Sequence, residues 1–278
     1  MSHARTKRLT NIILKTITFV ILVLLFLSEI FFSSITHFFG NFMVVVKSYP
    51  YRIIANNMMF FLFGLRGKIG GITLTILVAA VSLSLAFITG IVFGLMRYSR
   101  RWWLSYPAIG YIELIRAVPL ILVIFWFCFL PPGLSKQLKD VSRVYYAIMA
   151  FVCFTGAYVA EIVRAGIMSV GKGQMEAARS TGLTHTQAMT YIILPQALKN
   201  MIPSFVNQFV SLIKDTSLLW FVGVMEFTQT IFATSNREVN TDVTMGLYFF
   251  AAVVYFFICY PLTASSRWLE RRLGVGER

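Results

Sequence analysis

Long apolar runs separated by short polar segments dominate this chain. The clearest run, Ile69 to Met96, contains no Asp, Glu, Lys or Arg and is long enough to cross about 30 Å of hydrocarbon at about 1.5 Å of rise per residue. A second clear run extends from Val243 to Ser266. Because backbone amides find no water in hydrocarbon, such runs must form helices that satisfy their own hydrogen bonds. The pattern therefore predicts an all-α polytopic membrane protein.

Three further runs are expected to cross the membrane. Ala117 to Ser135 and Val144 to Ala160 are free of charge, and each is expected to extend past a charged pair on the cytoplasmic side. Asn200 to Met225 is interrupted only by one adjacent pair of opposite charges. The residues 131–133, Pro-Pro-Gly, are expected to close the third span with a turn that no helix continues.

The first apolar run, from about Ile12 to Phe32, follows a basic start and contains Glu29. A cleaved signal peptide would have the same basic start, but the small-residue cleavage pattern is missing after this run. We therefore expect an uncleaved anchor helix, which brings the predicted total to six spans.

The distribution of Lys and Arg predicts which side of the membrane each segment faces. With both termini in the cytoplasm, the inner segments carry 14 Lys and Arg, and outer segments of equal total length carry 8. Excess positive charge is typical of cytoplasmic loops, so we expect this orientation. The outer segments are then 33–68, 131–143 and 223–242, and the first is expected to lie along the interface.

Composition and charge exclude several classes of protein. With 58% hydrophobic residues, 13% charged residues and a mean hydropathy of +0.74, the chain is too apolar for a soluble domain of this length. The net charge of +14 is spread through short loops, which argues against nucleic-acid binding. The cysteines lie in apolar runs and the histidines lack ligand spacing, so we expect neither a disulfide framework nor a metal site.

No phosphate-binding loop of the ATPase type is found in the sequence. Such a loop needs Gly, four residues, Gly-Lys and then Ser or Thr, so that backbone amides surround the phosphate. The nearest Gly-Lys pairs, at 67–68 and 171–172, lack the leading glycine and the hydroxyl residue. We therefore expect no catalytic residue in this chain, and an energy source in another subunit or an ion gradient.

The long inner segment after the fourth run contains a bent pair of predicted helices. Gln174 to Ser180 has helix-forming composition, with Glu176 near its N-terminal end. Gly182 stands where a helix C-terminus needs a left-handed residue. Thr184 and Gln187 have the spacing of a capping box, which indicates that a second helix begins at once.

The second short helix has an apolar side formed by Met189, Ile192 and Ile193, and Pro195 is expected to limit how far it runs. An elbow of this kind suits docking into a groove on a soluble partner. An ordinary connecting loop has the same local signals, so these residues alone leave both interpretations open.

The same segment resembles the EAA loop of permease subunits in ABC importers. The matching residues are Glu176, Ala177, Ala178, Gly182, Ile192, Leu194 and Pro195. Outside the loop, residues 113–119, 158–166 and 214–218 are similar to the polar amino-acid permeases of that superfamily. The similarity covers roughly Gly70 to Leu273.

The resemblance implies the type I importer fold of the histidine, glutamine and glutamate/aspartate permease family. Residues 1–68 would form the anchor helix and outer segment. Residues 69–273 would form the transmembrane domain, with its coupling loop at 174–195. Residues 274–278 would be a cytoplasmic tail.

The resemblance also implies partners and a location. A chain of this kind would pair with a second permease, identical or paralogous, in the bacterial cytoplasmic (inner) membrane. Two ATP-binding subunits would bind below it and a periplasmic or extracellular substrate-binding protein above it. ATP and magnesium would belong to the ATP-binding subunits, and no cofactor is expected on this chain.

Charged residues inside the predicted spans are candidates for the substrate path, because a charge near the bilayer centre costs about 2.5–3.5 kcal/mol and must face protein or water. Glu113 and Arg116 are three residues apart, as are Glu161 and Arg164, so each pair can form along one helix. Arg116 and Glu161 lie deeper and could bind the carboxylate and ammonium groups of an amino acid. Alternatively, both pairs only brace helices near the cytoplasmic boundary.

A second candidate group, nearer the outer face, consists of Lys214, Asp215, Thr216 and Ser217. Adjacent residues on a helix project in different directions, so the two charges cannot simply pair along one face. We assign this group to the outer gate or the upper wall of a substrate cavity. Acidic and amide amino acids are the favoured substrates, because the resemblance is to glutamate/aspartate and glutamine permeases.

Two other functions compete with the importer permease. A stand-alone, ion-coupled amino-acid carrier would also be polytopic, but the chain shows no inverted repeat and six spans are few for such a protein. A membrane scaffold that only docks a cytoplasmic partner would keep the elbow but has less use for charges inside the spans.

Overall fold

The computed structural model describes residues 49–64, 69–238 and 241–273 of the 278-residue chain. The predicted anchor helix, at about residues 12–32, lies outside the described residues. The chain divides into two units, residues 1–56 and 57–278. The described element of the first unit is α2 (Tyr49–Asn56), and everything below concerns the second unit.

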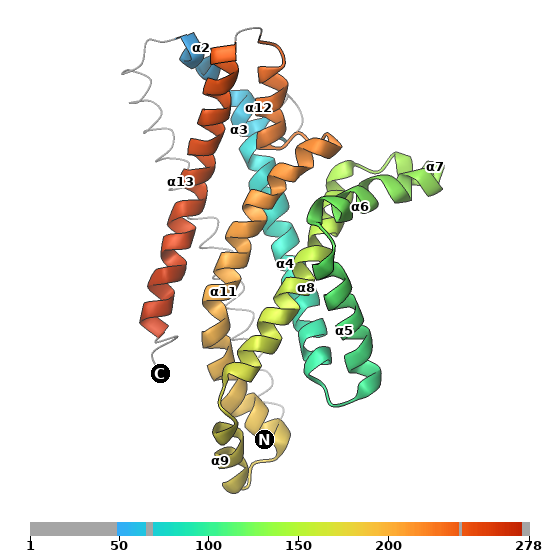
Figure 1. Ribbon diagram of the computed structural model, residues 1–278, viewed down its shortest axis with the longest axis vertical. Coiled ribbons are helices and arrows are strands. Elements are labelled where there is room, and N and C mark those ends of the chain that lie inside the picture. The colour runs from blue at the N-terminus through green and yellow to red at the C-terminus, as the bar shows by residue number, and fades with distance from the viewer. Residues whose placement is uncertain (1–48, 65–68, 239–240, 274–278) are drawn as a thin grey trace. The chain divides into compact units, whose positions relative to one another are not determined.

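Helices build the second unit, and its described residues form no β-sheet (Figure 1). In chain order the elements are α3 (Met58–Phe63), α4 (Gly71–Tyr98), α5 (Trp102–Ala117), α6 (Leu120–Leu134), α7 (Lys136–Lys139), α8 (Arg143–Ser169), α9 (Lys172–Ser180), α10 (His185–Ala188), a π-helical turn (Met189–Ile193), α11 (Leu194–Asp215), a 3₁₀ segment (Thr216–Val222), α12 (Phe227–Ser235) and α13 (Thr241–Leu273). The all-α fold class is confirmed.

Within the described residues, three helices are long and apolar enough to cross a membrane: α4, α8 and most of α13. They coincide with the predicted runs 69–96, 144–160 and 243–266, and α8 extends past Glu161 and Arg164 as expected. The bent pair α5 and α6 makes a fourth candidate if it counts as one span. The total of six spans stays a prediction.

The third predicted span is broken into two helices. The axes of α5 and α6 differ by 104°. Val118, between them, has φ −97° and ψ 136°, the extended geometry that a residue before proline favours. Pro119 also has no N–H to donate back into α5. The predicted run 117–135 thus forms the single helix α6, and the prediction that this helix extends past Glu113 and Arg116 is wrong.

The end of α6 also differs from the expectation. Pro131 and Pro132 lie inside the helix, which continues to Leu134, so the predicted turn at 131–133 is wrong. Both prolines fall in the last turn, where they remove N–H donors only from the end of the hydrogen-bond ladder. The rest of α6 keeps its backbone bonds.

The predicted helix over 200–225 ends earlier than expected, because α11 stops at Asp215 and the chain tightens into the 3₁₀ segment. Gly223, with φ +72°, closes that segment in the left-handed conformation. The chain then enters α12, which lies in the expected outer segment 223–242 and was not predicted.

Helices α4 and α8 share the most extensive helix contact in the described fold, and glycines allow it. A Cβ added at Gly94 would lie 2.7 Å from the Ala160 carbonyl oxygen and 2.8 Å from Val163 Cβ. A Cβ added at Gly90 would overlap Val159. Small residues let helix backbones approach closely in a membrane, where tight packing rather than water exclusion drives association.

We expect Gly94→Ala to destabilise the protein by about 1–3 kcal/mol, because the added methyl group overpacks a rigid backbone contact. Gly110→Ala is the matched control: it lies within α5, and nothing stands within 4 Å of its added Cβ. That control should unfold at or slightly above the wild-type temperature. Thermal unfolding of both purified variants in detergent measures the difference, and equal melting temperatures would contradict the packing argument.

Candidate functional site

The elbow between α9 and α10 forms at Gly182, as predicted. This glycine has φ +85°, and its N–H donates to the Arg179 carbonyl at 3.1 Å. The Leu183 N–H donates to the Ala178 carbonyl at 3.3 Å, so both bonds satisfy carbonyls at the end of α9. An added Cβ at Gly182 would meet nothing within 4 Å. The backbone angle, rather than lack of space, therefore requires glycine here.

The predicted capping box is present at the start of α10. The Gln187 N–H donates to Thr184 Oγ1 at 3.3 Å, and the Thr184 N–H donates to Gln187 Oε1 at 2.9 Å. Two backbone donors at the helix start are thus satisfied by side chains of the same turn. The second arm of the elbow therefore begins at a defined residue.

The second arm does not stop at Pro195. Helix α10 passes through the π-helical turn directly into α11, and Pro195 lies in the first turn of α11. Proline has no N–H to donate, so the continuous hydrogen-bond ladder loses one bond at this position but does not end. The prediction that Pro195 limits this helix is therefore wrong. One continuous helical path leads from the elbow to Asp215.

An apolar cluster fixes the elbow to the helices above it. Its buried members come from α8, from Val170 just after α8 and from the chain around the start of α11: Val159, Val163, Ile167, Val170, Ile193, Ala197 and Met201. Met175 of α9 and both Ile192 and Leu194 pack against this cluster while partly buried. Ile193 was predicted to belong to a docking face but is only 4% exposed, so the chain's own core covers it.

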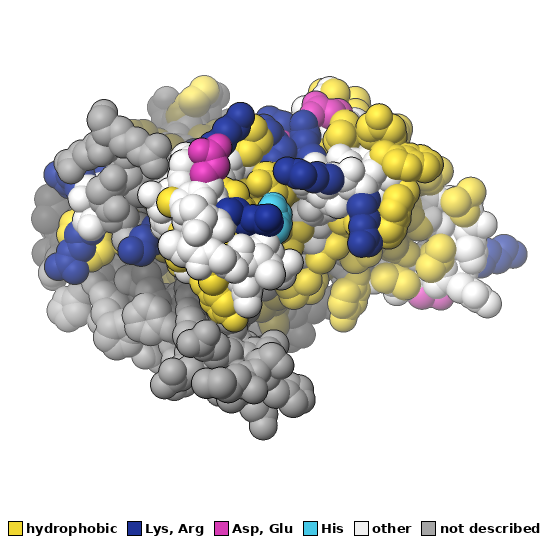
Figure 2. All heavy atoms as spheres, turned by 90° about the horizontal axis from the view of Figure 1, so that it is seen from below, with side chains coloured by type: hydrophobic (Ala, Val, Ile, Leu, Met, Phe, Trp, Pro, Cys, Tyr) yellow, Lys and Arg dark blue, Asp and Glu magenta, His cyan; other side chains and the backbone are white. Residues whose placement is uncertain are grey.

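The other residues of the EAA motif point in different directions. Glu176, Ala177, Gly182 and Pro195 are exposed, whereas Ala178 is buried. Figure 2 views the molecule from the end that carries α9 in Figure 1, where Lys and Arg side chains lie among white atoms, which are backbone or side chains neither charged nor hydrophobic, and hydrophobic side chains lie beside them. The exposed tip of the elbow is thus polar, and its inner side is apolar.

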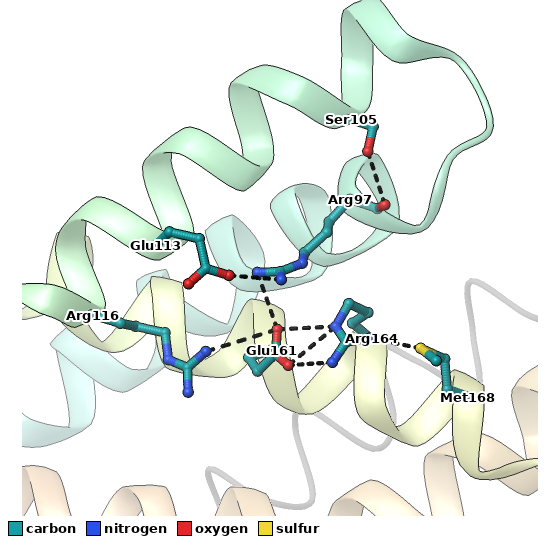
Figure 3. Close-up of polar contacts among 7 residues, drawn as sticks. All are labelled: Arg97, Ser105, Glu113, Arg116, Glu161, Arg164 and Met168. Carbon is teal, nitrogen blue, oxygen red and sulfur yellow. Dashed lines mark hydrogen bonds and ion pairs between the residues drawn. The ribbon is translucent and has the colours of Figure 1, made fainter.

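A cluster of charged side chains joins α4, α5 and α8 (Figure 3). Arg97 Nη2 lies 2.7 Å from Glu113 Oε1, and Arg97 Nη1 lies 3.3 Å from Glu161 Oε2. The side chains of Arg97 and Glu161 are 17% and 20% exposed. The described fold therefore pairs these charges across three helices, with Arg97 and Glu161 largely shielded from solvent and Glu113 56% exposed.

Glu161 is the centre of this cluster. Arg164 binds both of its carboxylate oxygens, as the spacing predicted. Arg116 Nη1 lies 4.0 Å from Glu161 Oε2, and its guanidinium lies 5.3 Å from the centre of the Tyr158 ring. The structure therefore brings the two deeper predicted residues together. The alternative pairing of Glu113 with Arg116 does not form, because Glu113 bonds Arg97 instead.

The second candidate group lies at the junction of α11 and the 3₁₀ segment. Lys214 is exposed, Asp215 and Ser217 are partly buried, and Thr216 is fully buried with its hydroxyl donating to the Ile213 carbonyl at 2.6 Å. Within the described residues, no ion pair or hydrogen bond joins this group to the Glu161 cluster. The structure thus keeps the two predicted groups apart.

Comparison with known proteins places the fold in a family. The model of binding-protein-dependent transport system inner membrane components matches residues 86–275. The chain belongs to this family. This permease is also 37% identical over 202 residues to a probable glutamine ABC transporter permease protein of Bacillus subtilis (strain 168), with 73% of this chain and 91% of the relative covered.

A second relative and a solved structure agree with this assignment. The permease is 34% identical over 207 residues to the glutamate/aspartate import permease of Escherichia coli O157:H7, with 73% of this chain and 91% of the relative covered. A chain in the crystal structure of an amino acid ABC transporter with histidines superposes with a TM-score of 0.71 at 27% identity, covering 82% of this permease and all of that chain. The type I importer fold is confirmed. The stand-alone carrier is not supported.

Sequence reasoning missed Arg97. It was counted only as a loop charge at the inner end of its span, whereas the structure places it between Glu113 and Glu161. The available signal was position: an arginine within a turn of the end of an apolar run can reach back to acids on neighbouring helices.

We expect Arg97→Gln to lower the free energy of unfolding by about 1–2 kcal/mol, because Glu113 and Glu161 both lose an ion-pair partner. The loss is no larger because solvent screens the exposed part of the cluster. Arg100→Gln is the control, because Arg100 is exposed and forms no ion pair with the described residues. Denaturation of the purified variants measures the effect. A loss for Arg97→Gln no larger than for Arg100→Gln would show that the cluster does not brace the three helices.

Proposed function

We propose that this permease forms half of the membrane pathway of an ATP-driven importer of polar amino acids. One observation carries the proposal. The polar elbow at Gly182 is continuous with α11 and is held to α8 by the apolar cluster, so a push on the elbow would move the helices that carry Glu161, Lys214 and Asp215.

The energy would come from partner subunits. Two ATP-binding subunits would hold ATP and Mg²⁺ and dock on the exposed residues of 174–195, while this chain stays non-catalytic and binds no cofactor. Their closure would press on the elbow and shift the helices between inward-open and outward-open states. A second permease, identical or paralogous, would complete the pathway, and a periplasmic or extracellular binding protein would deliver the substrate.

The substrate is proposed to be glutamine, glutamate or aspartate. The names of the relatives support this class, and so does charge, because three arginines surround two glutamates in the inner cluster. Arg116 would receive a carboxylate and Glu161 an ammonium group, while Lys214, Asp215, Thr216 and Ser217 would line the outer part of the path. Since Arg164 already binds Glu161, a substrate ammonium group would have to compete with that arginine.

The proposed location is the bacterial cytoplasmic (inner) membrane, with both termini in the cytoplasm. The excess of Lys and Arg in the inner segments supports this orientation. It puts the elbow in the cytoplasm, where ATP is available. Cysteine labelling of the exposed elbow with a membrane-impermeant reagent in intact cells would contradict the orientation.

The test is reconstitution of the permease with ATP-binding subunits and a binding protein from the same genome in liposomes. We expect uptake of radiolabelled glutamine, glutamate or aspartate that requires internal ATP, and ATP hydrolysis that rises when the loaded binding protein is added. Liposomes that contain the permease alone are the control. Uptake by the permease alone under a proton or sodium gradient would overturn the proposal.

We expect Gly182→Ala to reduce ATP-dependent uptake several-fold without preventing membrane insertion. The cost of about 1 kcal/mol for a left-handed residue with a side chain would distort the elbow and its docking surface. Gly173→Ala is the control, because Gly173 lies within α9 and also has nothing within 4 Å of an added Cβ. Wild-type coupling in Gly182→Ala would count against the docking role of the elbow.

A further inference from the structure

A hollow at the junction of α6, α7 and the start of α8 has no role in the function described so far. Its volume is about 340 Å³, which lies at the lower end of the range for sites that bind small molecules. The lining includes Phe129 and Pro132 of α6, Lys139 of α7, and Arg143 and Tyr146 of α8. Side chains from three helices therefore define one concave surface.

The hollow carries positive charge that nothing nearby neutralises. Of the described residues that line it, Lys139 and Arg143 are the charged ones, and no Asp or Glu of the described chain forms an ion pair with either. Asp140 follows Lys139 in the chain, but it is exposed and does not line the hollow. A concave surface lined by charge of one sign concentrates ions of the opposite sign. The lining therefore favours an anion.

Arg143 is held in place without losing its charge. Its Nη1 donates to the Val222 carbonyl at 3.0 Å, and a Cβ added at Gly223 would lie 3.1 Å from the same nitrogen. Because a carbonyl is neutral, this bond orients the guanidinium but leaves its positive charge uncompensated. A guanidinium has five N–H donors in a planar fork, so one bond to a carbonyl leaves others for a carboxylate. Such a pre-positioned donor loses less conformational freedom when a ligand binds.

The aromatic part of the lining is also fixed. The Tyr146 hydroxyl donates to the Leu138 carbonyl at 2.8 Å and thereby holds the end of α7 against α8. The rings of Tyr146 and Phe129 belong to the lining and offer contact for carbon atoms without a further charge. A ligand with a carboxylate on a short carbon stem therefore matches both the charged and the apolar parts of the hollow.

The hollow lies at the opposite end of α8 from the elbow. Arg143 is the first residue of α8 and Ser169 the last, and these 27 residues extend about 40 Å, enough to cross the hydrocarbon. An elbow in the cytoplasm therefore puts the hollow on the outer face. The bond from Arg143 to Val222 also joins it to the end of the 3₁₀ segment, whose first residue, Thr216, belongs to the outer candidate group.

We propose that this hollow is a carboxylate-binding site on the outer face of the permease, in which Lys139 and Arg143 hold the negative group and the aromatic lining contacts the carbon stem. The inference rests on the proposed function, because that function sets the orientation and the class of substrate. Two sources supply such a carboxylate: the amino acid itself and an acidic side chain of the binding protein. The site is separate from the Glu161 cluster, which lies about 27 Å further along α8.

The test follows chemical labelling of a cysteine in the hollow. Val141 lines the hollow and is 38% exposed, whereas Leu138 is 37% exposed and does not line it. Val141→Cys and Leu138→Cys therefore give a reporter and a matched control in the assembled complex in nanodiscs, and the unsubstituted complex gives the background from the natural cysteines. We expect saturating sodium glutamate to slow maleimide labelling of Val141→Cys about fivefold relative to sodium chloride at equal ionic strength. Labelling of Leu138→Cys should not change.

Removal of one charge tests whether the hollow itself binds the anion. Lys139→Gln in the Val141→Cys background should remove most of the protection by glutamate, because the carboxylate loses one of its two cations. Lys136→Gln is the control, since Lys136 is exposed on the same short helix but does not line the hollow. Lys139 is chosen over Arg143, which also bonds the Val222 carbonyl. Equal loss of protection in both variants would overturn the proposal, because it would reflect only the overall charge of α7.

A second arm, with loaded binding protein in place of free glutamate, identifies the source of the carboxylate. Protection of Val141→Cys by free glutamate assigns the site to the amino acid. Protection by the binding protein alone, lost again in Lys139→Gln, assigns it to an acidic side chain of that protein. Protection by neither overturns the proposal. So does protection by the binding protein alone that Lys139→Gln leaves intact, because the binding protein would then only cover the surface.

Uptake by the same wild-type complex separates this inference from the proposed function. ATP-dependent uptake together with no protection of Val141→Cys would overturn the inference alone. A wild-type complex that takes up no amino acid would instead defeat the proposed function, on which the inference rests.

Discussion

The contact between α8 and the start of α11, just below which the elbow begins, is the constraint on which the rest of the molecule depends. Val163 and Ile167 of α8 pack with Ile193, Ala197 and Met201 in one buried cluster, and Met175 of α9 reaches it from the elbow. Well-packed interiors transmit displacement, because their side chains have few voids to move into. An elbow joined to the helices only by flexible chain would absorb a push instead of passing it on.

Two glutamates, Glu161 and Glu226, are also held by specific neighbouring groups. In the inner cluster, Glu161 receives arginines from its own helix and from two others, whereas Glu226, the buried residue that caps the start of α12, receives backbone and hydroxyl donors. The first arrangement is partly exposed and is made by long side chains. The second is fully buried, so its partners cannot be replaced by water.

Local rules predicted the features that depend on neighbours in sequence. The left-handed Gly182, the capping box of Thr184 and Gln187, and the pairing of Glu161 with Arg164 all involve residues within one or two turns, and each forms as expected. The resemblance of the EAA segment added the family, which the fold and the comparisons confirm.

Features that depend on distant partners were not predictable in the same way. The sequence offered Glu113 a partner three residues away on α5, Arg116. In the structure Glu113 instead pairs with Arg97 of the neighbouring helix α4. Pro119 breaks its span, whereas Pro131 and Pro132 lie in the last turn of α6 and Pro195 lies in a helical path that continues to Asp215. Neither kind of information is contained in a hydropathy profile.

The π-helical turn at 189–193 has a consequence for how the elbow is aimed. A π turn accommodates one residue more than an α turn of the same ladder, and one residue corresponds to about 100° around a helix axis. The turn therefore sets the azimuth of α9 and α10 relative to α11. Loss of one residue there would leave both arms helical but rotate the exposed tip away from its present direction. The length of this short stretch, as much as its composition, therefore determines which way the tip of the elbow points.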